Sequence, residues 1–308
     1  MTTTDDLAIE VDGLRLRYGA TEVLQDVSFQ VRRGEVLALL GPNGAGKTST
    51  IEILEGFRMR SAGRIEVLGV DPAWGTEQWR SRMGIVLQSW RDHPKWRVRE
   101  LLAFQGSLYA PYSTAQIRRP WDIDDLLAAV GLTAQAQQPV KVLSGGQRRR
   151  LDVAIGLVGR PELVFLDEPT TGLDPEARRD FHDLVRRIRG EFETTVLITT
   201  HDLDEAEHLA DRIIVLAGGR IIADGTSAQL TRQIAGHDEV RWVRGGDRQV
   251  RHVADSTAFA RELFAREGEG IRELEIRRAS LEDAYLALVR HSETVAAEAV
   301  PEPNGASR

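Results

Sequence analysis

A short segment near the N-terminus combines glycine, lysine and threonine at the spacing that binds a polyphosphate. The pattern G-x-x-x-x-G-K-T is complete in Gly41, Pro42, Asn43, Gly44, Ala45, Gly46, Lys47 and Thr48. Glycines let the backbone curl so that several N–H groups face one point. Lys47 is then placed to reach the β- and γ-phosphates, and the Thr48 hydroxyl to hold Mg²⁺. The adjoining Ser49 belongs to the same predicted nucleotide site.

The residues on either side of this segment predict the strand and the helix that the motif requires. Val36–Leu40 is an apolar run typical of a buried strand, and Ser49–Glu55 is compatible with a helix. A helix that starts at the loop directs the positive end of its dipole toward the loop N–H groups. Because a chance glycine-rich turn lacks this context, the segment predicts a phosphate-binding loop.

A pair of carboxylates follows a second predicted strand. The apolar run Leu163–Leu166 leads directly into Asp167 and Glu168. An acidic residue at the end of a parallel strand lies where such sheets bind their ligands. We therefore expect Asp167 to support the Mg²⁺ shell and Glu168 to take the proton from an attacking water.

A second anion-binding point is predicted at Leu143–Gln147, which reads LSGGQ. Ser144 is a favourable N-cap residue, and Gly145 and Gly146 leave bare backbone N–H groups at the start of a helix. This point is far from the phosphate-binding loop in sequence and belongs to a separate helical region. One chain does not obviously use both points on one phosphate, whereas two copies facing each other would.

Together these segments resemble the ABC-family ATPases, and the similarity extends to about residue 225. In that family the LSGGQ segment is the signature, and Ser144 and Gly146 correspond to residues that contact the γ-phosphate bound by the other subunit. Gly145 and Gln147 complete the same predicted contact. The resemblance implies ATP and Mg²⁺ as cofactors, and a second copy of the chain as the partner in a nucleotide-sandwich dimer.

The same resemblance assigns four further residues. Tyr18 matches the aromatic residue that stacks on adenine, and Gln88, after the run MGIVL, matches the glutamine that senses Mg²⁺ and the attacking water. Asp174, in the run TGLD, matches the loop that crosses the dimer interface. His201, after the run VLITT, matches the histidine that holds the γ-phosphate. Apart from the resemblance, Tyr18 is compatible with a core residue at a strand end, and the other residues are ordinary polar side chains.

A narrower resemblance concerns residues 144–175 and the late run SLEDAYLALV. Both are similar to the ATP-binding subunits of two-component ABC-2-type exporters, including those of the daunorubicin-resistance type. This implies a separately encoded integral membrane permease, whose coupling helix docks on the helical region at about 89–112. It also implies a peripheral location on the cytoplasmic face of the cell membrane, and export of a drug-like or other hydrophobic compound. Drug, lipid, peptide and polysaccharide substrates all remain open.

The elements that must position these residues alternate between strands and helices. Residues 8–17 and 22–31 alternate in polarity and predict two antiparallel strands, whereas the later apolar strands alternate with helices and predict a parallel sheet covered on both faces. Residues 89–136 show a helical pattern without an evident strand. The expected fold class is α/β: a P-loop NTPase ABC cassette with a parallel-sheet core, an antiparallel β subdomain and a helical subdomain at about 89–158.

The last part of the chain has a different pattern. Short strands and helices over residues 235–290 predict a small α+β appendage after an ATPase domain at residues 1–230. Residues 291–308 are rich in alanine, glutamate, proline and glycine, and we expect a disordered tail there. The appendage is open to three roles: dimer clamping, regulation or stabilisation.

The composition narrows the possible functions. The net charge of −7 disfavours broad nucleic-acid binding, and the absence of cysteine excludes disulfides and thiolate chemistry. The polar N-terminus is not a secretory signal, and no apolar run approaches the roughly 18 residues of a spanning helix. The main alternative is a soluble ABC ATPase acting on ribosomes or DNA, although such chains usually carry two cassettes or long coiled coils. A small-molecule P-loop kinase would lack the LSGGQ segment.

Overall fold

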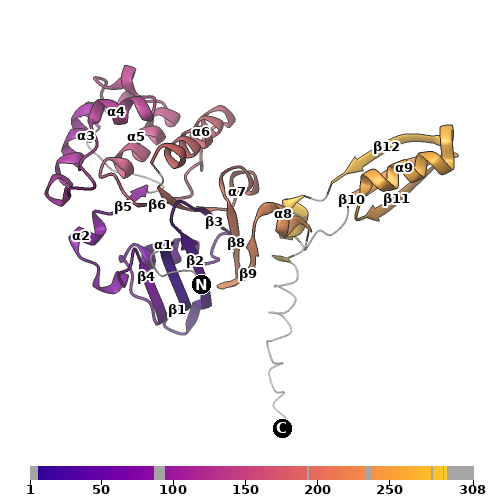
Figure 1. The fold of residues 1–308 in the computed structure, drawn as a ribbon, viewed down its shortest axis with the longest axis horizontal. Helices are drawn as coiled ribbons and strands as arrows, with labels where there is room; N and C mark the ends of the chain where they lie inside the picture. Colours follow the sequence, from indigo (N-terminus) through magenta and orange to yellow (C-terminus); the bar gives the residue numbers. More distant parts are fainter. Residues whose placement is uncertain are drawn as a thin grey trace, which may run out of the picture. The chain divides into compact units, whose positions relative to one another are not determined.

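The computed structural model describes residues 6–86, 94–192, 194–232, 238–278, 280–286 and 288–289. The chain divides into two compact units, Met1–Ile221 and Ile222–Arg308. Figure 1 labels most of the helices and strands. Among the described residues, no helix is both long enough and apolar enough to cross a membrane.

A six-stranded sheet forms the centre of the first unit. Its strand order is β5 (Met83–Val86), β6 (Leu163–Asp167), β7 (Thr195–Thr200), β3 (Val36–Leu40), β8 (Arg212–Ala217) and β9 (Arg220–Gly225). The pairs β5–β6, β6–β7, β7–β3 and β3–β8 are all parallel. Strands β8 and β9 are joined by Gly218 and Gly219, both at positive φ, a conformation typical of a tight hairpin turn. The predicted parallel sheet is confirmed.

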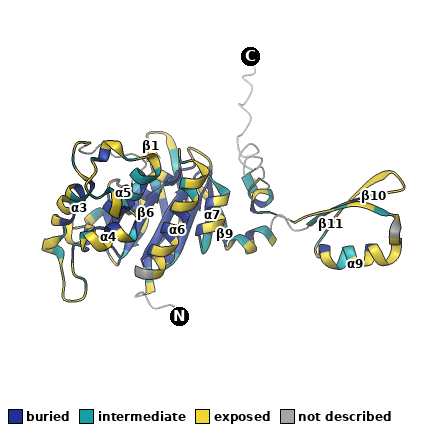
Figure 2. Ribbon diagram, turned by 90° about the horizontal axis from the view of Figure 1, so that it is seen from above, coloured by how far each residue is buried: buried dark blue, intermediate teal, exposed yellow. Residues whose placement is uncertain are grey.

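Side chains from both faces of this sheet are buried. On β6, Leu163 and Phe165 enter one apolar cluster, while Val164 and Leu166 enter another. The first cluster includes residues of α1 (Lys47–Leu54), and the second includes residues of α5 (Gly145–Leu157) and α6 (Pro175–Phe192). Figure 2 shows the sheet strands mainly in dark blue, the colour of buried residues. A short helix, α7 (Leu203–Leu209), connects β7 to β8.

A second sheet of the first unit is antiparallel, with the order β2 (Thr21–Arg32), β1 (Leu7–Tyr18) and β4 (Ala62–Val67). The tight turn between β1 and β2 places Gly19 at a φ of +59°, a conformation that glycine adopts without strain. This sheet confirms the antiparallel pair predicted over residues 8–17 and 22–31.

The helical region contains α3 (Val98–Ser107) and α4 (Ile123–Ala129), with 3₁₀ turns at Ala110–Tyr112, Thr133–Gln135 and Val140–Val142. Two shorter elements, the 3₁₀ turn Pro72–Trp74 and α2 (Glu77–Arg80), precede β5. Trp96 and Trp121, both partly buried, pack against the apolar cluster that α5 and α6 share. Gln88 and Trp90 lie outside the described residues.

The second unit contains α8 (Ser227–Leu230) and a three-stranded antiparallel sheet with the order β11 (Asp247–Val253), β10 (Asp238–Arg244) and β12 (Ile271–Arg277). Helix α9 (Ser256–Glu267), which is followed by a 3₁₀ turn at Gly268–Gly270, contributes Leu263 to the small core around Val240 and Trp242. The α+β character predicted for this part is confirmed. The predicted tail, residues 291–308, lies outside the described residues.

Candidate nucleotide site

Three neighbouring strands of the central sheet bring the predicted site residues to one edge. The phosphate-binding loop follows β3, Asp167 ends β6, and His201 directly follows β7. Because β6, β7 and β3 are adjacent and parallel, their carboxyl ends meet at the same edge. Parallel sheets bind ligands at this edge.

The loop backbone requires glycine at defined positions. Gly46, the N-cap of α1, has a φ of +105°, and a Cβ atom there would lie 2.5 Å from Leu24 Cδ2. Gly44 has a φ of +82°. At Gly41, a Cβ atom would lie 2.2 Å from the carbonyl oxygen of Leu216 on β8. Packing against β2 and β8 therefore holds the loop closely against the sheet.

Lys47 connects this loop to the carboxylate that follows β6. Its side chain is almost fully buried, and Nζ donates hydrogen bonds to the carbonyl oxygens of Gly41, at 2.8 Å, and Pro42, at 3.2 Å. Nζ also lies 3.4 Å from Glu168 Oε1. These three acceptors match the three N–H donors of the ammonium group and hold it at the phosphate-binding loop.

Glu168 has an unusual backbone conformation. Its φ is +43°, which is uncommon for any residue other than glycine. The conformation is supported by its N–H, which donates to the carbonyl oxygen and the Oγ1 of Thr199, each at 3.1 Å. Its carboxylate lies 3.4 Å from His201 Nδ1 and accepts a hydrogen bond from Thr171 Oγ1 at 3.3 Å. A strained residue held by several contacts is typical of functional sites.

Asp167 and Thr48 provide oxygen donors of the kind that Mg²⁺ prefers. Thr199 Oγ1 donates a short hydrogen bond to Asp167 Oδ1, which orients this carboxylate at the strand end. Thr48 is exposed on the first turn of α1. In the part of the chain that the structure describes, no cluster of three or more His, Cys, Asp or Glu side chains is arranged to hold a metal. Such a cluster is not required for Mg²⁺, because this ion is commonly bound through only one or two carboxylates together with substrate phosphates.

The LSGGQ segment forms a complete capping box at the start of α5. Ser144 Oγ accepts from the Gln147 N–H at 3.3 Å, and Gln147 Oε1 accepts from the Ser144 N–H at 3.0 Å. The predicted N-cap is therefore confirmed. A Cβ atom at Gly145 would meet nothing within 4 Å, whereas one at Gly146 would lie 3.2 Å from Ala177 Cβ on α6.

A separate hollow of about 300 Å³ contains this segment. It is lined by Ser144, Gly145, Gly146, Gln147, Arg150, Gly172, Leu173, Asp174, Glu176, Ala177 and Asp180. Asp174 also accepts from the Ala177 N–H at 2.9 Å, which caps α6. The structure thus brings Asp174 together with the LSGGQ segment, and no residue of the phosphate-binding loop lines this hollow.

Comparison with known proteins identifies the family. The family model described as ABC transporter matches residues 24–171. The chain is 42% identical over 243 residues to the daunorubicin resistance ATP-binding protein DrrA3 of Streptomyces coeruleorubidus, which covers 79% of this chain and 72% of that protein. The chain belongs to the ABC transporter family. As a member it is an ATP-binding subunit that hydrolyses ATP.

Two further similarities support this membership. The chain is 38% identical over 301 residues to the Nod factor export ATP-binding protein I of Neorhizobium galegae, covering 92% of this chain and 85% of that protein. A solved structure described as the ATP-binding subunit of an ABC transporter matches with a TM-score of 0.62 and 30% identity, over 73% of this chain and 92% of the other. The predicted similarity to ABC-2-type exporter ATPases is confirmed.

Tyr18, the predicted adenine-stacking residue of this ABC subunit, lies at the end of β1 with 46% of its surface exposed. The guanidinium of Arg58 lies over its ring, 5.1 Å from the centroid. An exposed ring that already carries a cation on one face is available for stacking on the other. Arg58 was not anticipated from the sequence, because it follows α1 and is far from Tyr18 along the chain.

Glu55 is a second residue near the ABC site that the sequence did not indicate. It caps the C-terminus of α1 and is 3% exposed. Burial, together with the nearby charges of Asp167 and Glu52, raises the pKa of its carboxyl group to about 8. No local pattern distinguishes Glu55 from an ordinary helix-end glutamate, since its burial depends on how α1 packs onto the sheet.

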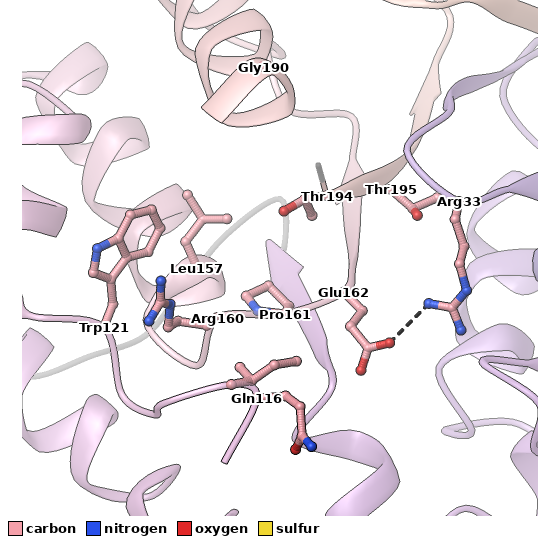
Figure 3. A pocket seen from close by; sticks show the side chains of 11 residues that line it. Arg33, Gln116, Trp121, Leu157, Arg160, Pro161, Glu162, Gly190, Thr194 and Thr195 are labelled. Atoms are coloured by element: carbon pink, nitrogen blue, oxygen red, sulfur yellow. Dashed lines mark hydrogen bonds and ion pairs between the residues drawn. The ribbon is translucent and has the colours of Figure 1, made fainter. Parts of the chain in front are cut away.

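A larger cavity of about 580 Å³ lies at the opposite edge of the sheet from the ABC motifs (Figure 3). Its lining includes Glu162 and Thr195, which stand at the amino ends of β6 and β7. Glu162 accepts hydrogen bonds from Arg33 at 3.0 Å and from Arg82 at 2.6 Å, and these partners lower the pKa of its carboxyl group. None of the predicted nucleotide-site residues lines this cavity.

Proposed function

We propose that two copies of this chain close around two Mg·ATP and that hydrolysis reopens them to drive a separate membrane permease. The observation that carries the proposal is the separation between the phosphate-binding loop and the hollow formed by the LSGGQ segment and Asp174. Two facing copies would supply each bound nucleotide with a loop from one chain and a signature from the other. Nucleotide drives such closure only because it binds the closed state more tightly.

Residues of the loop side carry the proposed chemistry. Lys47 and His201 would hold the γ-phosphate, and Glu168, which lies 3.4 Å from both side chains, would accept the proton of the attacking water. Thr48, Asp167 and Gln88 would hold Mg²⁺, which neutralises charge that develops on the phosphate oxygens. Ser49 and Tyr18 would complete the nucleotide site within a domain at residues 1–230.

A permease partner is supported by the relatives and by the helical region. Two relatives are named as ATP-binding proteins of daunorubicin resistance and of Nod factor export. Phe104 on α3 is 46% exposed and meets Trp96 edge to face with ring centroids 5.3 Å apart, and the adjacent Leu108 is 55% exposed. Exposed apolar side chains of this kind suit a partner surface. We place the chain on the cytoplasmic face of the cell membrane, where the permease would export a drug-like or other hydrophobic compound.

A detergent pull-down tests this proposal. Tagged protein carrying Glu168→Gln is incubated with Mg·ATP, and the proteins that co-purify are identified by mass spectrometry. We expect a polytopic membrane protein, whose enrichment falls when ATP is omitted. Ribosomes or nucleic acid without a membrane protein would instead favour the alternative, a soluble ABC ATPase.

A further inference from the structure

The hydroxyl group of Thr199 on β7 bonds to both of the acidic residues at the end of β6. Thr199 is 0% exposed, and the strand register places it opposite Asp167. Its Oγ1 donates a hydrogen bond to Asp167 Oδ1 and accepts one from the Glu168 N–H at 3.1 Å. One buried hydroxyl group therefore contacts the predicted metal ligand and the predicted base at the same time.

These two partners determine the orientation of the hydroxyl group. An ionised carboxylate only accepts hydrogen bonds and a backbone N–H only donates them, so the Thr199 proton lies toward Asp167 and a lone pair lies toward Glu168. The bond to Asp167 is of the charge-assisted kind, which is stronger than a bond between neutral groups. This bond turns Oδ1 toward β7, so Oδ2 is the oxygen left to an outside ligand.

The backbone conformation of Glu168 depends on the same threonine. A φ of +43° is unfavourable for a residue with a Cβ atom, so surrounding contacts must hold it. The Glu168 N–H bonds to the carbonyl oxygen and to the Oγ1 of Thr199, each at 3.1 Å. This backbone directs the carboxylate to its place 3.4 Å from Lys47 Nζ and 3.4 Å from His201 Nδ1. Loss of the hydroxyl group would remove one of the two bonds and keep the other.

We propose that Thr199 is a positioning residue that fixes Asp167 and Glu168 relative to each other. The inference rests on the proposed nucleotide site, in which Asp167 supports Mg²⁺ and Glu168 accepts the proton of the attacking water. The buried hydroxyl group acts on the reaction only through these two residues. Through them it sets which carboxylate oxygen of Asp167 the metal meets and where the base stands beside it.

Removal of the hydroxyl group tests both parts of this role. Thr199→Val keeps a β-branched side chain of similar shape in the strand. We expect the Kd of Mn²⁺ for the full chain saturated with ADP, measured from the EPR signal of free Mn²⁺, to rise about threefold or more, because Asp167 loses its orienting donor. At saturating Mg²⁺, kcat for ATP should fall about tenfold or more while KM changes less than about threefold, because Glu168 is held less firmly. Thr199→Ser, which keeps the hydroxyl group, should restore both values most of the way.

Two comparisons separate positioning from packing. Thr195→Val changes another buried threonine of β7, whose Oγ1 accepts a hydrogen bond from the Gly34 N–H at 3.0 Å, and it should leave the Mn²⁺ Kd and kcat as in the wild type. In a chain that already carries Glu168→Gln, Thr199→Val should still weaken Mn²⁺ binding. It should lower the residual turnover by less than about twofold, because the base through which it acts is absent.

Several outcomes would overturn the proposal. They are wild-type values in Thr199→Val, equal losses in the Val and Ser variants, matching losses in Thr195→Val, or a full tenfold loss of turnover on top of Glu168→Gln. If Thr199→Val does not fold, Thr199→Ala removes the same hydroxyl group and is judged by the same expectations. A wild-type chain that neither binds ADP nor hydrolyses ATP would instead remove the proposed nucleotide site itself.

Discussion

The phosphate-binding loop and the LSGGQ segment are both rich in glycine and both start a helix, yet they are held in different ways. The loop is pressed against the sheet, with Gly41 and Gly46 packed against Leu216 and Leu24, and its helix has no side-chain cap. The LSGGQ segment has a full capping box, and Gly145 faces open space. The first is therefore shaped by its own chain, and the second is a finished helix end that a second molecule can cover.

The largest expected effect on ATP hydrolysis comes from placing a bulky side chain at Ser144, the N-cap of α5. Ser144→Arg should abolish ATP hydrolysis while the ATP affinity of the monomer stays near that of the wild type, because the loop side is untouched. Steady-state hydrolysis and nucleotide titration measure the two properties. Normal hydrolysis by this variant would mean that the site is not shared between two copies.

Glu168→Gln is the matching change on the loop side. It removes the proposed base, so turnover should fall about a hundredfold or more while ATP binding is kept.

Mixing the Ser144→Arg and Glu168→Gln variants tests directly whether the loop of one copy works with the LSGGQ segment of the other. A dimer of one Ser144→Arg chain and one Glu168→Gln chain contains one intact composite site out of two. Because about half of the dimers in an equal mixture are of this kind, we expect the mixture to recover about a quarter of wild-type hydrolysis. A mixture without recovery would contradict the shared site.

Alanine substitutions at Gly46 and at Gly145 should differ in their effect on the free energy of unfolding. Gly46→Ala forces a Cβ atom against Leu24 at a φ of +105°, so we expect the free energy of unfolding to fall by about 2 kcal/mol. Gly145→Ala meets no atom within 4 Å and should change it by less than about 0.5 kcal/mol. Urea unfolding measures both values, and equal losses would remove the distinction between the two helix starts.

A smaller effect concerns the buried carboxyl group at the end of the loop helix. The pKa of Glu55 is raised in the folded state to about 8, so its contribution to stability is complete below the unfolded value of 4.5 and is lost as the pH rises to about 8. Between pH 6 and 8, the free energy of unfolding of the wild type should fall with pH more steeply than that of Glu55→Gln, by about 1 kcal/mol for each pH unit. Urea unfolding of both proteins across this range tests it, and parallel curves would contradict the raised pKa.

Much of the fold followed from local pattern. Val36–Leu40 and the loop that follows are contiguous in sequence, so the strand, the loop and α1 could be predicted together. The cap at Ser144 was predictable for the same reason, since its partner Gln147 lies three residues away. The antiparallel pair β1–β2 also joins neighbours along the chain. Hydrophobic periodicity and hydrogen bonds between near neighbours in sequence indicate such elements without information on distant contacts.

Only the tertiary structure decided which distant residues meet. Thr199 supports Asp167 and Glu168 because β7 pairs with β6 in a register that places Thr199 opposite Asp167. Asp174 and the LSGGQ segment share one hollow because α5 packs beside α6. The burial of Glu55 and Arg149 likewise depends on helices packing onto the sheet. Strand register and helix packing are set by the whole core, so no short stretch of sequence contains this information.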